Sequence, residues 1–269
     1  MAPRRGPRRA RRRAGRLSSR GLALAGLGIA AVAVAVAGVW FAFLRSDGGE
    51  GGPPRAAIVD QLSVNVPNPD FRETATETLE QAGYLVDYYP GEQVTVDFYR
   101  HLPSEDYDVI VFRSHADRLQ ATTVQGEDFD EVILFTAEEY SKDKYVSEQS
   151  DNRLVIARYF EGGPGYFGIA SGFIEGQPGD YDGATIIMMG CEGLLTDATA
   201  KAFVSEGAKT YISWNETVTA DHTDAATDAL LRHLLTEGET PGQAVAQTMS
   251  ELGPDPVFGS ELEVYPNES

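Results

Sequence analysis

The chain has 269 residues and a formal net charge of −19, with 41 acidic residues against 22 lysines and arginines. The first 20 residues carry nine arginines and no acid, so the remainder carries −28 (−19 minus +9). Such an acidic surface repels nucleic acid and anionic lipid, which argues against nucleic acid as a partner, and it suits either a high-salt environment or ordinary solvation.

The N-terminal segment is predicted to be a membrane anchor. Residues 21–44 carry no charge, and a helix of this length can cross a hydrocarbon core of roughly 30 Å. A cleaved signal peptide is the alternative, but its apolar core is shorter, about 7–15 residues, and small residues follow it. Arginine-rich flanks stay in the cytoplasm. We therefore expect a cytoplasmic tail at 1–20, a single transmembrane helix at 21–44, a linker at 45–55 and an extracytoplasmic domain at 56–269.

From residue 56, apolar strands alternate with amphipathic helices. Asn68 and Pro69 have the types preferred at an N-cap and at a first helical position, and Gly83 suits the end of that helix. Residues 117–182 are less regular and suggest loops and a hairpin, with short strands at 131–135 and 153–157. The other predicted strands are 56–59, 84–89, 107–113, 184–189 and 210–214, and the other predicted helices are 96–102, 197–206, 225–234 and 240–252.

This alternation predicts an α/β fold with a mostly parallel open sheet covered by helices on both faces. Right-handed crossovers bring the carboxyl ends of parallel strands to one edge. Working sites of such sheets lie along that edge, near the point where the strand order reverses.

Two residues with useful chemistry follow predicted strands at that edge. His115 follows the strand at 107–113, and Cys191, the single cysteine, follows the strand at 184–189. An imidazole beside a thiol can take its proton and generate a nucleophilic thiolate. Backbone N–H groups in the turn after Cys191, at Glu192 and Gly193, would suit a developing oxyanion. The bland alternative is a buried cysteine and a structural histidine.

The order of these motifs resembles the caspase-like cysteine peptidases, the group that includes caspases, gingipains, clostripain, separase and CHAT domains. The resemblance rests on strand–Ser114-His115, strand–Gly190-Cys191-Glu192-Gly193, a helix, Glu206-Gly207-Ala208-Lys209, and a strand ending at Trp214. It spans roughly residues 56–250, and its closing part is most similar to gingipain and CHAT-type domains.

The resemblance implies that Cys191 is the nucleophile and His115 the general base of a peptidase acting on peptide or protein substrates. It implies a substrate pocket near Trp214 and Asn215. The family usually has glycine after the histidine, with an amide that helps to form the oxyanion hole. Ala116 stands there in this chain, which puts activity in question rather than the fold. Asp60 and Asp221, with Glu192, would favour a basic substrate side chain.

Other interpretations stay open. A catalytically silent caspase-like domain would bind or sense at the cell surface, and a cysteine amidohydrolase would pair Cys191 with His222. Asp221, His222 and Asp224 form only a thin candidate for a metal site. His233 shares the apolar helix face and is expected to pack there. The sequence indicates no cofactor and no metal, and it leaves the oligomeric state open.

Overall fold

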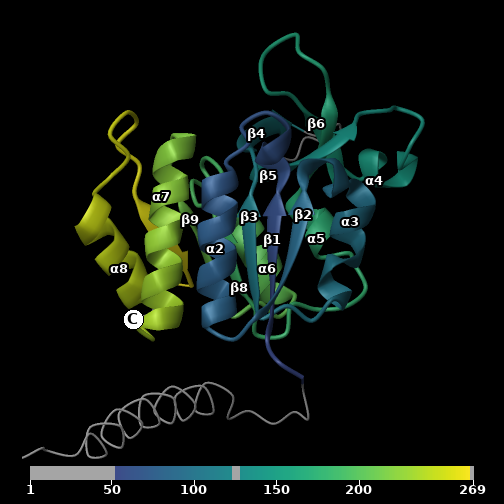
Figure 1. The fold of residues 1–269 in the computed structure, drawn as a ribbon. Helices are drawn as coiled ribbons and strands as arrows, with labels where there is room; N and C mark the ends of the chain where they lie inside the picture. Colours follow the sequence, from purple (N-terminus) through teal and green to yellow (C-terminus); the bar gives the residue numbers. More distant parts are fainter. Residues whose placement is uncertain (1–51, 123–127, 267–269) are drawn as a thin grey trace, which may run out of the picture. The chain divides into compact units, whose positions relative to one another are not determined.

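The computed structural model describes residues 52–122 and 128–266 (Figure 1). Residues from Gly52 onward group into one compact unit. The arginine-rich tail, the predicted transmembrane helix and most of the linker lie outside the described residues, so they stay predictions. No helix in the described part of the chain combines the length and apolarity needed to span a bilayer.

A six-stranded sheet forms the centre of the domain. Its order is β10-β9-β8-β3-β1-β2, and only β10 runs antiparallel to its neighbour. The mostly parallel sheet predicted from the continuous apolar runs is therefore confirmed, whereas the antiparallel edge strand β10 was not predicted. The strands are β1 (Arg55–Asp60), β2 (Leu85–Pro90), β3 (Val109–Arg113), β8 (Thr185–Met188), β9 (Thr210–Trp214) and β10 (Leu262–Tyr265).

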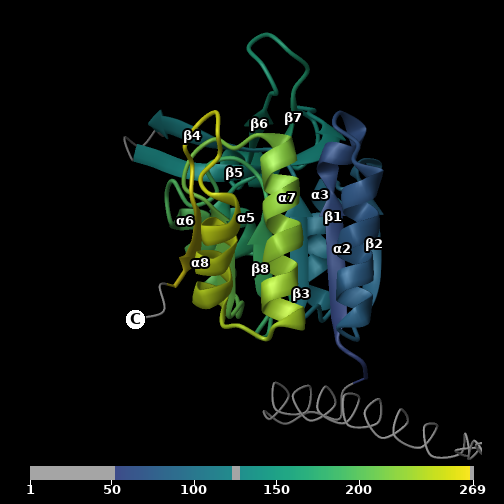
Figure 2. The same ribbon diagram turned by 60° about the vertical axis from the view of Figure 1, so that its left-hand side comes forward.

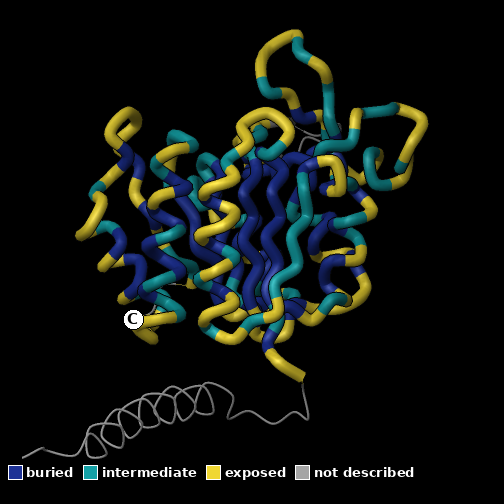
Figure 3. The backbone as a smooth tube through the Cα atoms, in the orientation of Figure 1, coloured by how far each residue is buried: buried dark blue, intermediate teal, exposed yellow. Residues whose placement is uncertain are grey.

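Helices cover both faces of this sheet, as Figures 1 and 2 show. Side chains alternate along β1, so that Ala56 and Ile58 pack on one face while Ala57 and Val59 pack on the other. Both layers are apolar, which leaves the central strands buried (Figure 3). One face carries α2 (Pro69–Gln81), α7 (Ala220–Leu231) and α8 (Pro241–Leu252), and the other carries α3 (Val96–His101), α5 (Ser171–Ile174) and α6 (Ala198–Ser205).

The predicted start of α2 is confirmed in atomic detail. Asn68 is the N-cap, and its side-chain oxygen accepts a hydrogen bond from the backbone N–H of Phe71 at 3.1 Å. Pro69 occupies the first turn, where its missing N–H has no cost. Gly83 adopts a φ of +93° just beyond the helix, which glycine tolerates best.

A second, antiparallel sheet lies at the carboxyl end of the parallel strands. Its order is β4-β5-β7-β6, and in Figure 1 it lies beyond the tips of β3 and β1. The prediction of loops and a hairpin for this region was incomplete, because the two short strands that it contained belong to a full four-stranded sheet. The strands are β4 (Ala116–Thr122), β5 (Asp128–Glu139), β6 (Leu154–Ala157) and β7 (Tyr166–Ile169), with the short helix α4 (Val146–Ser150) between β5 and β6.

Candidate active site

His115 and Cys191 leave neighbouring parallel strands at the same rim. Phe112 in β3 pairs with Met188 in β8, and the N–H of Met189 donates to the carbonyl of Phe112 at 2.9 Å. The two turns then pack together at Gly190. A Cβ atom there would lie 2.5 Å from the Ser114 carbonyl oxygen. Only glycine lets the turn that carries Cys191 approach the turn that carries His115 so closely.

The turn at His115 is held by Gln61, which directly follows β1, the neighbour of β3 in the sheet. The backbone N–H of His115 donates to the Gln61 side-chain oxygen at 3.0 Å, and the Gln61 amide nitrogen donates to the Tyr159 hydroxyl at 2.7 Å. The Tyr159 ring lies 4.7 Å from the imidazole and that of Phe135 lies 5.8 Å away, measured between centroids. Gln61 directly follows β1, so the switch between β1 and β3 lies within this site.

The imidazole of His115 is half-buried and favours its neutral form. Burial lowers the pKa of His115, and the positive charge of Arg113 lowers it further. Within the described residues, neither imidazole nitrogen makes a hydrogen bond with the protein. A neutral imidazole with an unengaged nitrogen is chemically able to accept a proton.

The thiol of Cys191 favours its protonated form. Burial raises the pKa of Cys191, and the negative charges of Glu192 and Asp117 raise it as well. Its sulfur lies 3.5 Å from the carbonyl oxygen of Val218, to which the thiol donates a hydrogen bond. In the described part of the chain, no hydrogen bond joins this sulfur to His115. Both residues therefore lie at one rim, and the direction of each pKa shift favours the uncharged form of the side chain.

The turn after Cys191 pairs with the continuation of β9. Glu192 adopts a left-handed φ of 62°, and its N–H donates to the Glu216 carbonyl at 3.0 Å. The Glu192 amide is thus already engaged, which corrects its predicted place among the oxyanion donors. Gly193 packs so closely that a Cβ would lie 2.1 Å from the Ser213 hydroxyl oxygen. No acceptor for the Gly193 N–H is found among the described residues.

Ala116 begins the edge strand β4, and its amide direction follows from the ladder. The N–H of Phe135 donates to the His115 carbonyl at 3.0 Å, and Ala116 lies opposite Leu134 in β5. Hydrogen-bonded and non-hydrogen-bonded pairs alternate in an antiparallel ladder, so the Ala116 N–H points away from β5. It therefore has no partner in that strand, although the residue is not glycine.

Two of the four predicted pocket residues are buried and do not line a surface open to substrate. Asp60 is 1% exposed and binds Arg113 at 2.9 Å. Trp214 is also 1% exposed, and its indole N–H donates to Thr223 at 2.9 Å. Asn215 exchanges hydrogen bonds with the backbone of Glu261, which positions the start of β10. Asp221 is exposed in the first turn of α7.

A buried ionic network behind the rim explains the position of Asp60. The Arg113 guanidinium binds Asp60 and also both carboxylate oxygens of Asp224, at 2.7 and 2.8 Å. The ion pairs of Arg113 with Asp60 and Asp224 were not predicted from the sequence. The signal that could have found them is the arginine that ends an otherwise apolar strand, because a buried cation requires buried carboxylates.

The alternatives built on His222 receive no support from its contacts. Its Nε2 lies 3.2 Å from the Gly253 carbonyl oxygen, and its ring lies against Trp214. Asp224 is bound to Arg113, and among the described residues Asp221, His222 and Asp224 do not bring three ligand atoms together. A cavity of about 330 Å³ lies at the opposite, amino-terminal ends of β3 and β8, where Asp106, Asp108, Asp180 and Asp182 line it.

Comparison with known proteins gives no family for this chain. No family model matches it. No curated protein matches it either. The functional argument therefore rests on the arrangement of the residues themselves.

Proposed function

We propose that the domain is a cysteine peptidase of caspase-like type in which Cys191 is the nucleophile and His115 the general base. The observation that carries the proposal is the contact at Gly190, which packs the two turns against each other at the carboxyl rim. A histidine and the chain's single cysteine lie on these two turns. The unengaged imidazole and the half-buried thiol are the two groups that thiol-based acyl transfer requires.

The reaction proceeds through an acyl-enzyme. His115 takes the thiol proton of Cys191 as the sulfur attacks the peptide carbonyl, and the carbonyl oxygen becomes an oxyanion. The amides of Ala116 and Gly193 are the donors proposed to stabilise it. The imidazolium then protonates the leaving amine as the C–N bond breaks. Water, deprotonated by His115, hydrolyses the thioester and restores the thiol.

The membrane setting of this peptidase is proposed from the sequence. The uncharged run at 21–44 would anchor the chain in the bilayer as a single span, and the arginines before it would keep the N-terminus in the cytoplasm. The domain would then act on peptide or protein substrates outside the cytoplasm.

A silent binding or sensing domain is the second candidate, favoured by two observations. The Cys191 thiol bonds to the Val218 carbonyl rather than to an imidazole, and the residue after His115 is alanine. In a silent domain the Cys191 sulfur would behave as an isolated buried thiol. His115 would then not increase the rate at which a substrate-like electrophile reacts with it.

A covalent peptidyl probe separates these candidates. We expect a peptidyl electrophile to label the purified full-length chain on Cys191 at neutral pH, and labelling to be lost in Cys191→Ser and His115→Ala. His222→Ala is the matched control and should label normally. Iodoacetamide, which needs no catalytic base, reports the thiol alone, and its rate should rise only as pH approaches or exceeds 9.0, the usual thiol pKa.

The outcomes exclude one another. Loss of probe labelling in His222→Ala but not in His115→Ala would favour the amidohydrolase. Probe labelling that merely follows the iodoacetamide profile, with no effect of either histidine, would contradict the peptidase and leave the silent domain.

A further inference from the structure

The segment between α7 and α8 folds back on itself around a buried histidine. The π-helix η4 (Arg232–Thr236) continues α7, and the N–H of Glu237 donates to the Arg232 carbonyl at 3.1 Å. Gly238 adopts a φ of +71°, and the N–H of Glu239 then donates to the His233 carbonyl at 3.1 Å. This turn brings Glu239 beside His233, which already shares a helix face with Glu237 four residues on.

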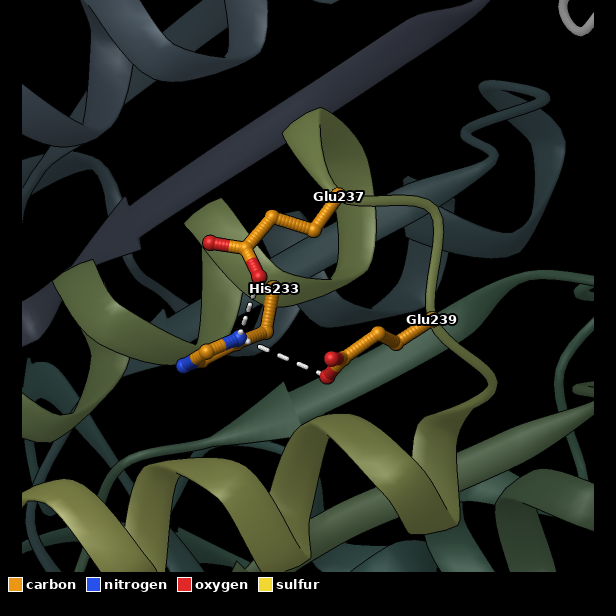
Figure 4. Close-up of side chains that lie close together, drawn as sticks. All are labelled: His233, Glu237 and Glu239. Atoms are coloured by element: carbon orange, nitrogen blue, oxygen red, sulfur yellow. Dashed lines mark hydrogen bonds and ion pairs between the residues drawn. The ribbon is translucent and has the colours of Figure 1, made fainter.

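Three potential ligand atoms converge in this turn, as Figure 4 shows. Nδ1 of His233 lies 3.2 Å from a carboxylate oxygen of Glu237 and 3.4 Å from one of Glu239. All three ligand atoms lie within 4.8 Å of one another. Ligand atoms held about 2.0–2.2 Å from a tetrahedral zinc ion lie about 3.3 Å apart. The two distances from Nδ1 of His233 to the carboxylate oxygens are close to that value.

The surroundings of His233 match those of a metal ligand. Its side chain is only 8% exposed, and its other ring nitrogen, Nε2, lies 3.4 Å from a carboxylate oxygen of Glu251 in α8. Metal-bound histidines typically direct their second nitrogen to such a carboxylate, which fixes the ring orientation. His233 was expected to pack against apolar neighbours. It is buried as expected, but both of its nitrogens face carboxylates.

The cluster also has unmet charge and an unmet hydrogen-bond acceptor. Oε2 of Glu239 is buried and accepts no hydrogen bond within the described part of the chain, although it lies 3.4 Å from Nδ1 of His233. Arg232 binds Glu237 and Glu251 at 3.0 and 2.7 Å. The three carboxylates of Glu237, Glu239 and Glu251 thus outnumber the single guanidinium beside them, and a divalent cation would offset this excess of negative charge.

We propose that His233, Glu237 and Glu239 bind one divalent transition-metal ion, with Glu251 as the positioning residue for the imidazole. A nitrogen ligand beside two carboxylates favours zinc and its neighbours in the first row over calcium or magnesium, which prefer all-oxygen sites. The ion joins the end of α7 to the start of α8. Because α7 starts at the rim that holds Cys191 and runs away from it (Figure 1), the ion acts in stability and not in the proposed catalysis.

Zinc titration of the purified full-length chain tests the site. After treatment with chelator and dialysis, isothermal titration calorimetry should show one strong zinc site per chain, and zinc should raise the thermal midpoint because it binds only the folded state. Loss of an outer partner typically costs about 10–100-fold in metal affinity. We therefore expect Glu251→Gln to weaken binding by about that factor and Glu239→Gln, which removes a ligand, to weaken it by more.

A second histidine–acid pair supplies the matched control. His101 and Asp97 also lie four residues apart on a helix, at 3.6 Å, but both are exposed, and among the described residues no third ligand joins them. His101→Ala should leave zinc affinity unchanged. Thermal midpoints in chelator should agree between the wild type and Glu239→Gln, which shows that the variant folds. Equal zinc affinities in those two proteins, or an equal loss in His101→Ala, would overturn the proposal.

Discussion

At the scale of single residues, Arg113 is a buried cation that neutralises two buried carboxylates. Its side chain is fully buried between Asp60 and Asp224, which are themselves almost fully buried. Such a network adds little net stability compared with an apolar replacement of the whole set, but removal of one member leaves charge buried without a counterion.

Replacement of Arg113 by leucine should therefore destabilise the fold strongly. We expect the free energy of unfolding to fall by about 3–5 kcal/mol, because two buried carboxylates lose their cation. The matched control is Arg118→Leu, which removes a surface pair with Asp130 at 2.6 Å and should leave the free energy of unfolding nearly unchanged. Urea denaturation measures both, and similar losses in the two variants would contradict the interpretation.

Asp228 gives the domain a pH-dependent weak point. Burial and, to a smaller extent, the nearby charge of Asp224 together raise the pKa of Asp228 from 3.8 to about 7. The folded pKa lies above the unfolded one, so the folded state binds the proton more tightly. The contribution of Asp228 to the free energy of unfolding is therefore most favourable below pH 3.8. It falls as the pH rises from 3.8 to about 7 and stays at the lower value above pH 7.

Asp228→Asn should remove that loss. Each pKa unit corresponds to about 1.4 kcal/mol, and discounting for solvent screening leaves an expected gain of about 1–2 kcal/mol above pH 7. The gain should vanish at acid pH, where the wild-type carboxyl is already neutral. Asp221→Asn, an exposed position on the same helix, should change neither value. A gain from Asp228→Asn that does not depend on pH would contradict this account.

At the scale of elements, the close packing of the turn after β3 against the turn after β8 determines whether His115 and Cys191 lie at the same place on the rim. Gly190→Ala would place a methyl group against the Ser114 backbone carbonyl, which cannot rotate away. We expect a cost of about 1–3 kcal/mol in unfolding free energy from overpacking. We also expect loss of probe labelling at Cys191.

Gly172→Ala is the control for this substitution. A Cβ at Gly172 would meet only the Arg153 side chain, at an ordinary 3.4 Å. Stability and labelling should therefore match those of the wild type. Equal behaviour of the two glycine variants would show that the turns are not in the close contact described.

The elements that sequence predicted are those whose signal is local. Continuous apolar runs marked the parallel strands, and the Asn68-Pro69 pair marked the start of α2. The second sheet was seen only in part. β5 and β6 overlap the predicted strands at 131–135 and 153–157, whereas β4 and β7 were assigned to loops and a hairpin. β7 has only four residues and includes Gly168, and β4 includes Asp117, Arg118 and Gln120, so neither gives a strong apolar signal. The placement of His115 and Cys191 at one rim followed from strand direction. The Gln61–Tyr159 contact did not, because those residues are 98 positions apart and meet only through the second sheet.

At the scale of the whole molecule, excess negative charge is the dominant feature. Outside the first 20 residues the chain carries −28, and only four lysines lie among the remaining cations. Repulsion among such charges opposes the compact state and is screened by salt.

Sodium chloride should therefore stabilise the protein. We expect the urea midpoint to rise as the salt concentration increases from low to molar levels, most steeply where the Debye length shortens from about 30 Å to about 10 Å. Sodium sulfate at matched ionic strength is the comparison, because sulfate also stabilises folded proteins by being excluded from their surface. Any stabilisation by sulfate beyond that by sodium chloride therefore reports this exclusion rather than charge screening. A midpoint that falls with sodium chloride would contradict the role assigned to repulsion.

The direction of β1 has a practical consequence. This strand begins at Arg55, while Gln61, just beyond its other end, reaches the His115 turn. Attachment through residues upstream of Arg55, to a sensor chip or a bead, therefore grips the domain at the end remote from Cys191. Captured this way, the domain should leave the turns that carry His115 and Cys191 accessible to macromolecules as large as a folded protein.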